Sequence, residues 1–271
     1  MKTHYVITIV LSLSILVGCK QQQKKAPDPE KEDQGLEERE EALQPITLTK
    51  LENSPAYTDA SLTLNTPETI KVSEKGEVDF AFEIQNYELG AQTPGPNPSV
   101  LANSGKGQHI HFILNNQPYS AHYAPEFKKE IPDGVHHLVA FLSRSYHESV
   151  KNANSMVIRK LEVGANPQDT ADLDMKAPTL IYSRPKGTYA GKDAEQVLLD
   201  FFVLNTTLSK SGSKVKATIN GEEFIITEWV PHVIKGLPIG EVTIQLELLD
   251  ENGVLIPGPF NKVTRKVTLK E

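Results

Sequence analysis

The stretch GEVTIQLEL (residues 240–248) alternates polar and apolar side chains along its whole length. Such alternation predicts a β-strand with one face buried and the other in water. A second stretch, GVHHLVAFL (134–142), has the same length and lies 106 residues earlier (240 − 134). The two stretches are the first indication that the chain contains an internal repeat.

Three more pairs of stretches match in the same order along the chain. They are VDFAFEIQNYEL (78–89) with VLLDFFVLNTTL (197–208), HIHFILNNQPY (109–119) with KVKATINGEEF (214–224), and MVIRKLEV (156–163) with KVTRKVTL (262–269). The offset between copies falls from 119 to 105 residues, so the first copy carries about 14 extra residues. These lie in GAQTPGPNPSVLANSGKG (90–107), whose Gly, Pro, Asn and Ser content predicts a loop.

The repeat predicts the fold class. Each copy holds about seven short strands in roughly 90–115 residues, which is typical of an immunoglobulin-like β-sandwich. We therefore expect an all-β protein with two tandem sandwiches, the first over 46–165 and the second over 179–271, joined by a linker at 166–178. Asn220-Gly221 predicts a two-residue hairpin turn, and we expect Asn115-Asn116 to form the same turn in the first copy.

The N-terminus has the features of an export signal. Lys2 precedes an apolar run that is too short for a comfortable membrane span. The run ends in Leu-Val-Gly-Cys at residues 16–19, which resembles the lipobox of bacterial lipoproteins; the alternative is an ordinary signal peptide with a coincidental cysteine. The resemblance implies that 1–19 is a signal peptide and that Cys19 is lipidated, while 20–45 lacks the apolar groups needed to fold and is expected to be a disordered tether.

Charge and cysteine content restrict the partners. The chain has 28 basic and 35 acidic residues, and removal of the predicted signal takes away only Lys2, so the net charge becomes −8 (27 − 35). This charge disfavours nucleic acid and anionic lipid surfaces. Cys19 is the only cysteine, so no disulfide is expected. Lys20, rather than Asp, follows Cys19, which by resemblance to the usual sorting rule implies anchoring to the outer membrane of a Gram-negative cell envelope.

Histidines concentrate in the first copy of the repeat. Six of the eight lie between residues 109 and 147: His109, His111, His122, His136, His137 and His147. None of the matching positions in the second copy is a histidine: Lys214, Lys216, Thr227, Val242, Thr243 and Gly253. The fold itself therefore does not require histidine at these places, which points to a role specific to the first sandwich.

The predicted hairpin turn brings three of these histidines together. Its register places His109 directly opposite His122, with His111 on the same face two residues away. This layout resembles that of the ligands in α-class carbonic anhydrases, although only over this hairpin. We therefore predict that His109, His111 and His122 hold a divalent metal, zinc or copper, since open three-histidine sites suit these ions.

The alternative is that these histidines are ordinary polar surface, because the same face of the second copy is polar. Against this, Ile113, Val139 and Phe141 make the face partly apolar in the first copy. An apolar sheet face needs cover. We expect that either the 90–107 loop or the second sandwich covers it.

Four further residues receive weaker assignments. His136 shares strand parity with core positions and is predicted to be buried and hydrogen-bonded, although an ancillary role at the metal site stays open. His147 lies in a loop and can approach the site, and Glu148 is a candidate supporting carboxylate or base. Trp229 is expected to be a packing anchor rather than a binding platform.

Longer segments carry a family resemblance. GQHIHFILNN…GVHHLVAF resembles an uncharacterised domain of bacterial exported proteins, with a histidine-rich strand followed by Gly-x-His-x-Leu. The resemblance places His109, His111 and His136 on that family's histidines. GTYAGK…LLDFFVLN…PGPFN is similar to the second half of bacterial two-domain lipoproteins. The resemblance implies no reaction, and this strand has one His-x-His where the family often has a histidine triplet.

Three functions remain open from the sequence. The first is a membrane-tethered binding or scaffold lipoprotein with a divalent-metal site. The second is a zinc-dependent enzyme in which three histidines hold the ion and Glu148 orients the attacking water. The third is a structural or adhesive module that contacts envelope proteins or glycans. Because immunoglobulin-like sandwiches serve mostly in binding and spacing, we favour the non-catalytic functions.

Overall fold

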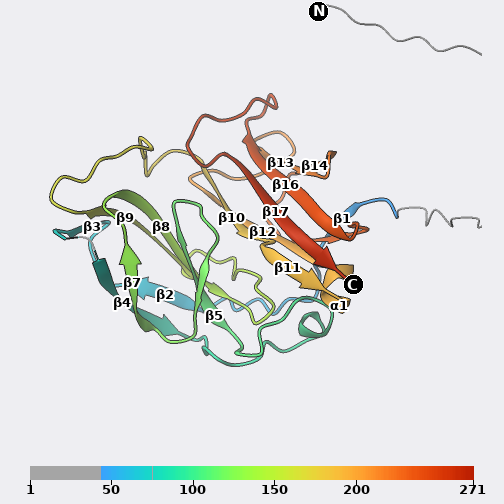
Figure 1. The fold of residues 1–271 in the computed structure, drawn as a ribbon, viewed down its shortest axis with the longest axis horizontal. Coiled ribbons are helices and arrows are strands. Elements are labelled where there is room, and N and C mark those ends of the chain that lie inside the picture. Colours follow the sequence, from blue (N-terminus) through green and yellow to red (C-terminus); the bar gives the residue numbers. More distant parts are fainter. Residues whose placement is uncertain (1–43, 75) are drawn as a thin grey trace, which may run out of the picture. The chain divides into compact units, whose positions relative to one another are not determined.

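The computed structural model describes residues 44–74 and 76–271 (Figure 1). The predicted signal peptide, Cys19 and nearly all of the predicted tether therefore lie outside the described residues. Within the described part, the chain is almost entirely β-strand and turn, with the short helix α1 (Lys192–Glu195) and one 3₁₀ turn, η1 (Asn97–Ser99). No helix among these residues has the length and apolar character needed to cross a membrane.

The first copy of the repeat forms a sandwich of two sheets. One sheet has the order β2 (Ser61–Leu64), β4 (Gly76–Gln85), β7 (Glu126–Ile131). The other has the order β3 (Thr69–Val72), β9 (Met156–Val163), β8 (Gly134–Ser143), β5 (His109–Leu114), β6 (Ser120–His122). The 90–107 segment contains η1 and joins β4 to β5 as the predicted loop.

The second copy repeats this arrangement strand for strand. One sheet has the order β1 (Thr47–Lys50), β15 (His232–Lys235), β12 (Val197–Leu204), β10 (Thr179–Arg184). The other has the order β11 (Gly187–Ala190), β17 (Lys262–Lys270), β16 (Gly240–Leu249), β13 (Lys214–Ile219), β14 (Glu222–Ile226). The all-β class and the two tandem immunoglobulin-like sandwiches are therefore confirmed.

Strand β1 is the exception to this symmetry. It lies within 46–165, the residues that the sequence assigned to the first sandwich, but it pairs antiparallel with β15 of the second, Thr47 opposite Lys235. A four-residue strand at a sheet edge has no counterpart in the other copy and carries little pattern of its own. The repeat therefore gives no indication of the strand with which β1 pairs.

Alternation along the strands explains both cores. On β16 the apolar residues of the 240–248 stretch all lie in the core of the second sandwich: Val242, Ile244, Leu246 and Leu248. Strand β12 differs, because all eight of its residues are buried. One face of β12 enters the second core, while Phe202 and Leu204 on the other face pack against the first sandwich.

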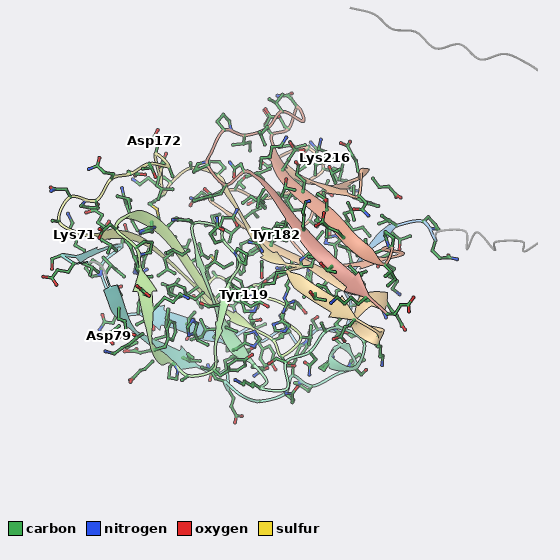
Figure 2. All side chains as sticks on the ribbon, viewed as in Figure 1. Lys71, Asp79, Tyr119, Asp172, Tyr182 and Lys216 are labelled. Atoms are coloured by element: carbon green, nitrogen blue, oxygen red, sulfur yellow. The ribbon has the colours of Figure 1, made fainter. Side chains whose placement is uncertain are left out.

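A separate apolar cluster joins the two sandwiches. Ile113, Val139 and Phe141 from the first sandwich pack against Ile181, Phe202 and Leu204 from the second. This confirms that the apolar face next to the histidines is covered, and it identifies the second sandwich as the main cover. Tyr119, a member of this cluster, lies in the middle of the described unit, whereas Lys71 and Lys216 lie at its outside (Figure 2).

Polar contacts hold the same junction in place. The Asn116 side-chain oxygen accepts a hydrogen bond of 2.7 Å from the backbone N–H of Tyr182, and Arg265 donates to the Asn116 carbonyl at 3.0 Å. Within the second sandwich, Trp229 donates from Nε1 to the Phe201 carbonyl at 2.8 Å, and its ring lies 5.2 Å from that of the junction residue Phe202. Trp229 is thus a packing anchor, as predicted. The junction orients β10 over the histidine-bearing face of β5.

Candidate metal centre

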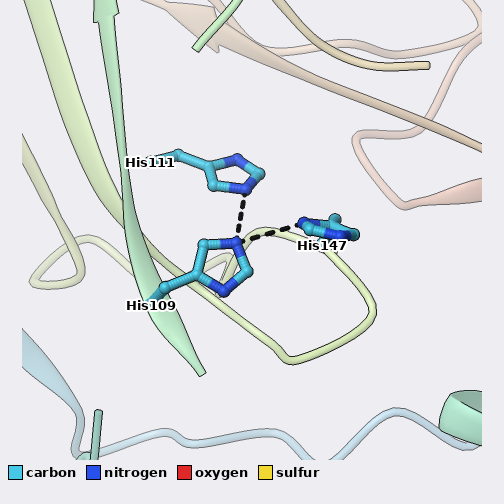
Figure 3. Close-up of side chains that lie close together, drawn as sticks. All are labelled: His109, His111 and His147. Atoms are coloured by element: carbon cyan, nitrogen blue, oxygen red, sulfur yellow. Dashed lines mark hydrogen bonds between the residues drawn. The ribbon is translucent and has the colours of Figure 1, made fainter. Parts of the chain in front are cut away.

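Three histidines converge between the two sandwiches (Figure 3). Nε2 of His109 lies 2.9 Å from Nε2 of His111 and 3.1 Å from Nδ1 of His147. The three nitrogen atoms all lie within 4.8 Å of one another. His109 and His111 are fully buried, and His147 is partly exposed. We call His109, His111 and His147 the histidine triad.

Strand periodicity supplies two members of the triad. His109 and His111 are two residues apart on β5, so both side chains leave the same face of the sheet. The intervening Ile110 and the following Phe112 point into the core of the first sandwich. This part of the site was predictable from the sequence.

A tight turn supplies the third member. The backbone N–H of His147 donates to the Arg144 carbonyl at 2.9 Å, which closes the turn after β8. His147 has φ of 71°, a left-handed conformation that is unfavourable for a residue with a Cβ. The matching residue of the second copy is Gly253, with φ of 80°. The first copy thus carries a histidine where the repeat otherwise has glycine, and the turn directs its ring at His109.

The structure does not bring His122 to the triad. It pairs His122 with Ile110, one residue out of the predicted register. The hairpin turn itself forms as expected, since Asn115 and Asn116 both have positive φ and Gln117 N–H donates to the Leu114 carbonyl at 2.9 Å. The register changes after the turn, because pairing resumes only at Ser120.

Pro118 gives the physical reason for this shift. Proline has no backbone N–H and cannot continue the hydrogen-bond ladder, so one extra residue is taken up before β6 begins. A one-residue shift moves each following side chain to the opposite face. The ring of His122 therefore stacks on Phe127 at 3.4 Å, at the edge of the first core, and the prediction that it faces His109 is wrong.

Hydrogen bonds orient the triad rings. Nδ1 of His109 donates to the Gly107 carbonyl at 2.8 Å, so Nε2 of this ring carries the lone pair. A hydrogen bond between the Nε2 atoms then requires His111 to be the donor. Nδ1 of His111 lies 3.3 Å from Oγ of Ser183, on β10 of the second sandwich. The hydroxyl can accept or donate, so the contact with Ser183 is compatible with either tautomer of His111.

The surroundings keep the triad uncharged. Burial lowers the pKa of His109 to about 4. Burial, followed by the other triad rings and then Arg184, lowers the pKa of His111 well below its usual value. Burial and then the charge of Arg184 lower the pKa of His147 well below its usual value. Neutral imidazoles are the form that binds metal ions.

The spacing of the triad is close to that of a metal site. Zinc binds histidine nitrogen at about 2.0–2.1 Å, so two nitrogens of a tetrahedral site lie about 3.3 Å apart. The two short distances, 2.9 and 3.1 Å, require the rings to separate by a few tenths of an ångström, and the nitrogens of His111 and His147, which lie within 4.8 Å of each other, must come to the same spacing. Three protein ligands leave a fourth position open. Copper also suits imidazole ligands.

The ancillary residues have other partners. Glu148 forms a buried ion pair of 3.0 Å with Arg144 and accepts a hydrogen bond from Ser54, so its carboxylate belongs to a different network. His136 lies 2.8 Å from the Pro132 carbonyl and 2.8 Å from the Asn115 amide, in agreement with the predicted buried, hydrogen-bonded histidine. Neither residue is placed at the triad.

Three residues next to the triad were missed by the sequence analysis. The ring of Tyr119 stacks on His111 at 3.4 Å, and its hydroxyl lies 3.2 Å from Nδ1 of His147. Arg184 and Lys186 lie over the same tyrosine ring, at 5.2 and 3.7 Å from its centroid. Arg184 and Lys186 come from the second copy, where no motif pointed to the histidines. Only the docking of the sandwiches brings them there.

Comparison with known proteins gives no family. No family model matches the chain, and no curated protein matches it. Among solved structures, the chain is similar to the fibronectin(III)-like modules of CbhA from Clostridium thermocellum (14% identity, 77% of this chain and 94% of that chain, TM-score 0.28). It is also similar to the two tandem V-type regions of VCBP3 (10%, 78% and 100%, TM-score 0.23). A third is SGBP-B of the Bacteroides ovatus mixed-linkage glucan utilization locus (8%, 77% and 70%, TM-score 0.24). Likenesses at this level leave ligand and activity open.

Proposed function

We propose that the protein is a binding module that holds one divalent metal ion, zinc or copper, through His109, His111 and His147. The observation that carries the proposal is the convergence of three neutral imidazoles, two of them fully buried, on one point between the sandwiches. Most side-chain hydrogen bonds in folded proteins go to backbone groups or water rather than to other side chains. Here the ring of His109 instead forms hydrogen bonds with the rings of both other triad members, His111 and His147.

The second layer around the triad supports the same proposal. Metal-bound histidines commonly donate their other ring N–H to a carbonyl or another fixed acceptor. The Gly107 carbonyl serves His109 in this way, and Ser183 Oγ can accept from His111. Metal binding would thus need a change of tautomer at both His111 and His147, together with ring movements. It would also link the two sandwiches, since Ser183 lies on β10.

The location of this module rests on the sequence alone. We include in the proposal that Cys19 is lipidated and that the acyl chains anchor the chain to the outer membrane, with residues 20–45 as a tether. The resemblance to bacterial exported lipoproteins belongs to the same proposal. An envelope protein or a glycan remains the proposed partner of a membrane-tethered scaffold.

Metal titration tests the proposal. A chain that starts at Lys20 contains every described residue and lacks the predicted lipidation site, Cys19. It should bind one equivalent of Zn²⁺ or Cu²⁺ at neutral pH, measured by elemental analysis and competition titration after removal of metal. His111→Ala should lose this binding, while circular dichroism confirms that the variant is folded. A parent chain that binds neither ion would contradict the proposal.

A further inference from the structure

A group of positive charges lies next to the triad without acidic partners. Arg184 and Arg265 are more than nine-tenths buried, and Lys186 is partly buried. Their hydrogen bonds go to neutral oxygens: Arg184 to the Tyr189 hydroxyl at 2.9 Å, Lys186 to the Tyr119 carbonyl, and Arg265 to the carbonyls of Ser183 and Asn116. Among residues 44–74 and 76–271, none of the three forms an ion pair with a carboxylate.

Such an arrangement is unusual because buried charges are normally paired. Tyrosine rings relieve part of the penalty, since the guanidinium carbon of Arg265 lies 4.3 Å from the Tyr182 centroid. Cation–π contacts of this kind do not neutralise the charge. The local surplus is still three positive charges. Arg184 and Lys186 lie over Tyr119, whose ring stacks on His111, and a divalent metal at the triad would add two more charges.

Arg184 also has an unused donor. Its Nε is buried and has no hydrogen-bond partner among the described residues. Unsatisfied buried donors are rare in folded proteins and often indicate an ion or water that binds there. The guanidinium lies over the ring of Tyr119, 5.2 Å from its centroid, and the Tyr119 hydroxyl in turn lies 3.2 Å from Nδ1 of His147. Tyr119 therefore contacts both Arg184 and His147, the partly exposed member of the triad.

We propose that the fourth ligand of the metal is a small oxyanion, of the carboxylate or phosphate class, and that Arg184 holds it. This inference rests on the proposed metal site. The anion would supply the missing negative charge, accept from the free Nε of Arg184, and complete a tetrahedral site. Guanidinium and oxyanion match each other in geometry.

Cobalt gives a direct test, because the visible spectrum of tetrahedral Co²⁺ responds to its fourth ligand. The chain from Lys20 is loaded with Co²⁺ at constant pH and ionic strength and titrated with acetate and, separately, with inorganic phosphate. At least one anion should shift the spectrum, and the shift should saturate as the anion concentration rises. Arg184→Gln should lower the affinity for that anion by about tenfold or more, while the affinity for Co²⁺ stays within about threefold of the parent. The exposed cation Lys71 on β3 supplies the control, and Lys71→Gln should behave as the parent.

The outcomes separate the two proposals. Loss of Co²⁺ and Zn²⁺ binding altogether would overturn the metal site and the anion with it. A bound Co²⁺ whose spectrum ignores both anions would overturn the anion alone. If the parent and Arg184→Gln bound the anion with equal affinity, as measured by the spectral shift, the anion proposal would also be overturned, because the anion would then bind the metal without the arginine. Lys186→Gln, at the partly exposed edge, should give an intermediate loss if Arg184→Gln fails to fold.

Discussion

At the scale of single residues, Gly107 determines the orientation of His109. Its φ is +82°, and a Cβ there would lie 2.2 Å from the Gly90 carbonyl oxygen, which is too close for two non-bonded atoms. The Gly107 carbonyl also accepts the Nδ1–H of His109. The glycine therefore serves both the loop and the ring.

We expect Gly107→Ala to lower the free energy of unfolding by more than about 1 kcal/mol, because the backbone at Gly90 and Ala91 must move to make room for the added Cβ. It should also weaken zinc binding by about 10–100-fold, the usual effect of disturbing a partner of a metal-bound histidine. Chemical denaturation and zinc titration measure the two effects. Gly105→Ala is the matched control, since a Cβ there meets nothing within 4 Å and its φ is ordinary. Equal behaviour of the two variants would contradict this role of Gly107.

The residue scale also shows where sequence reasoning stops. His109 and His111 follow from alternation alone. The choice of His122 required a register, and the register was taken from the turn without allowing for Pro118, whose missing N–H shifts the pairing. His147 was visible as a loop residue opposite Gly253. Its approach to His109 depends on the exact course of the turn, which no sequence pattern encodes.

At the scale of strands, the site depends on the contact between β12 and the first sandwich. Phe202 on β12 is fully buried, with its ring 4.3 Å from that of Phe141 on β8. This contact holds the second sandwich against the face that carries the triad. β10, which bears Ser183 and Arg184, pairs with β12.

Phe202→Ala should lower the free energy of unfolding by about 3–5 kcal/mol, the range for removal of a buried phenylalanine. Denaturant unfolding measures this value. Ile225→Ala is the control, since Ile225 is 55% exposed and should change stability by no more than about 0.5 kcal/mol. If Phe202→Ala were as mild as the control, the two sandwiches would not be held together by this contact.

The strands themselves were the most predictable level. Strands β5, β8 and β13 begin at the first residues of the matched stretches, because alternation and the repeat both mark them. The covered face of β5 and β8 was inferred from Ile113, Val139 and Phe141. The pairing of β1 with β15 could not be inferred, since it depends on the docking of the sandwiches.

At the scale of the whole molecule, buried histidines make stability depend on pH. Burial lowers the pKa of His137 from 6.5 to about 4. Between these values the unfolded chain binds a proton that the folded chain does not, so stability is complete above pH 6.5 and falls as the pH drops towards 4. A shift of one pKa unit corresponds to about 1.4 kcal/mol, so His137 contributes roughly 3 kcal/mol to the pH-dependent part of the free energy of unfolding.

His137→Gln removes this pH-dependent contribution to stability. It keeps a polar side chain beside the surface pocket that His137 lines together with Phe260. We expect the loss of unfolding free energy between pH 7 and pH 4 to be smaller by roughly 2–3 kcal/mol than in the parent. Urea unfolding at the two pH values measures the difference. His137 is not in the triad, so the comparison holds without metal. An unchanged pH dependence would show that His137 is protonated in the folded chain.

The most direct test of the account compares two histidines that the sequence and the structure rank in opposite order. His147→Ala and His122→Ala are titrated with Zn²⁺ beside the parent, with folding checked by circular dichroism. We predict that His147→Ala loses affinity by about 100-fold or more, while His122→Ala, which removes a ring packed on Phe127, stays within about threefold. Loss of zinc in His122→Ala with full binding in His147→Ala would contradict the triad.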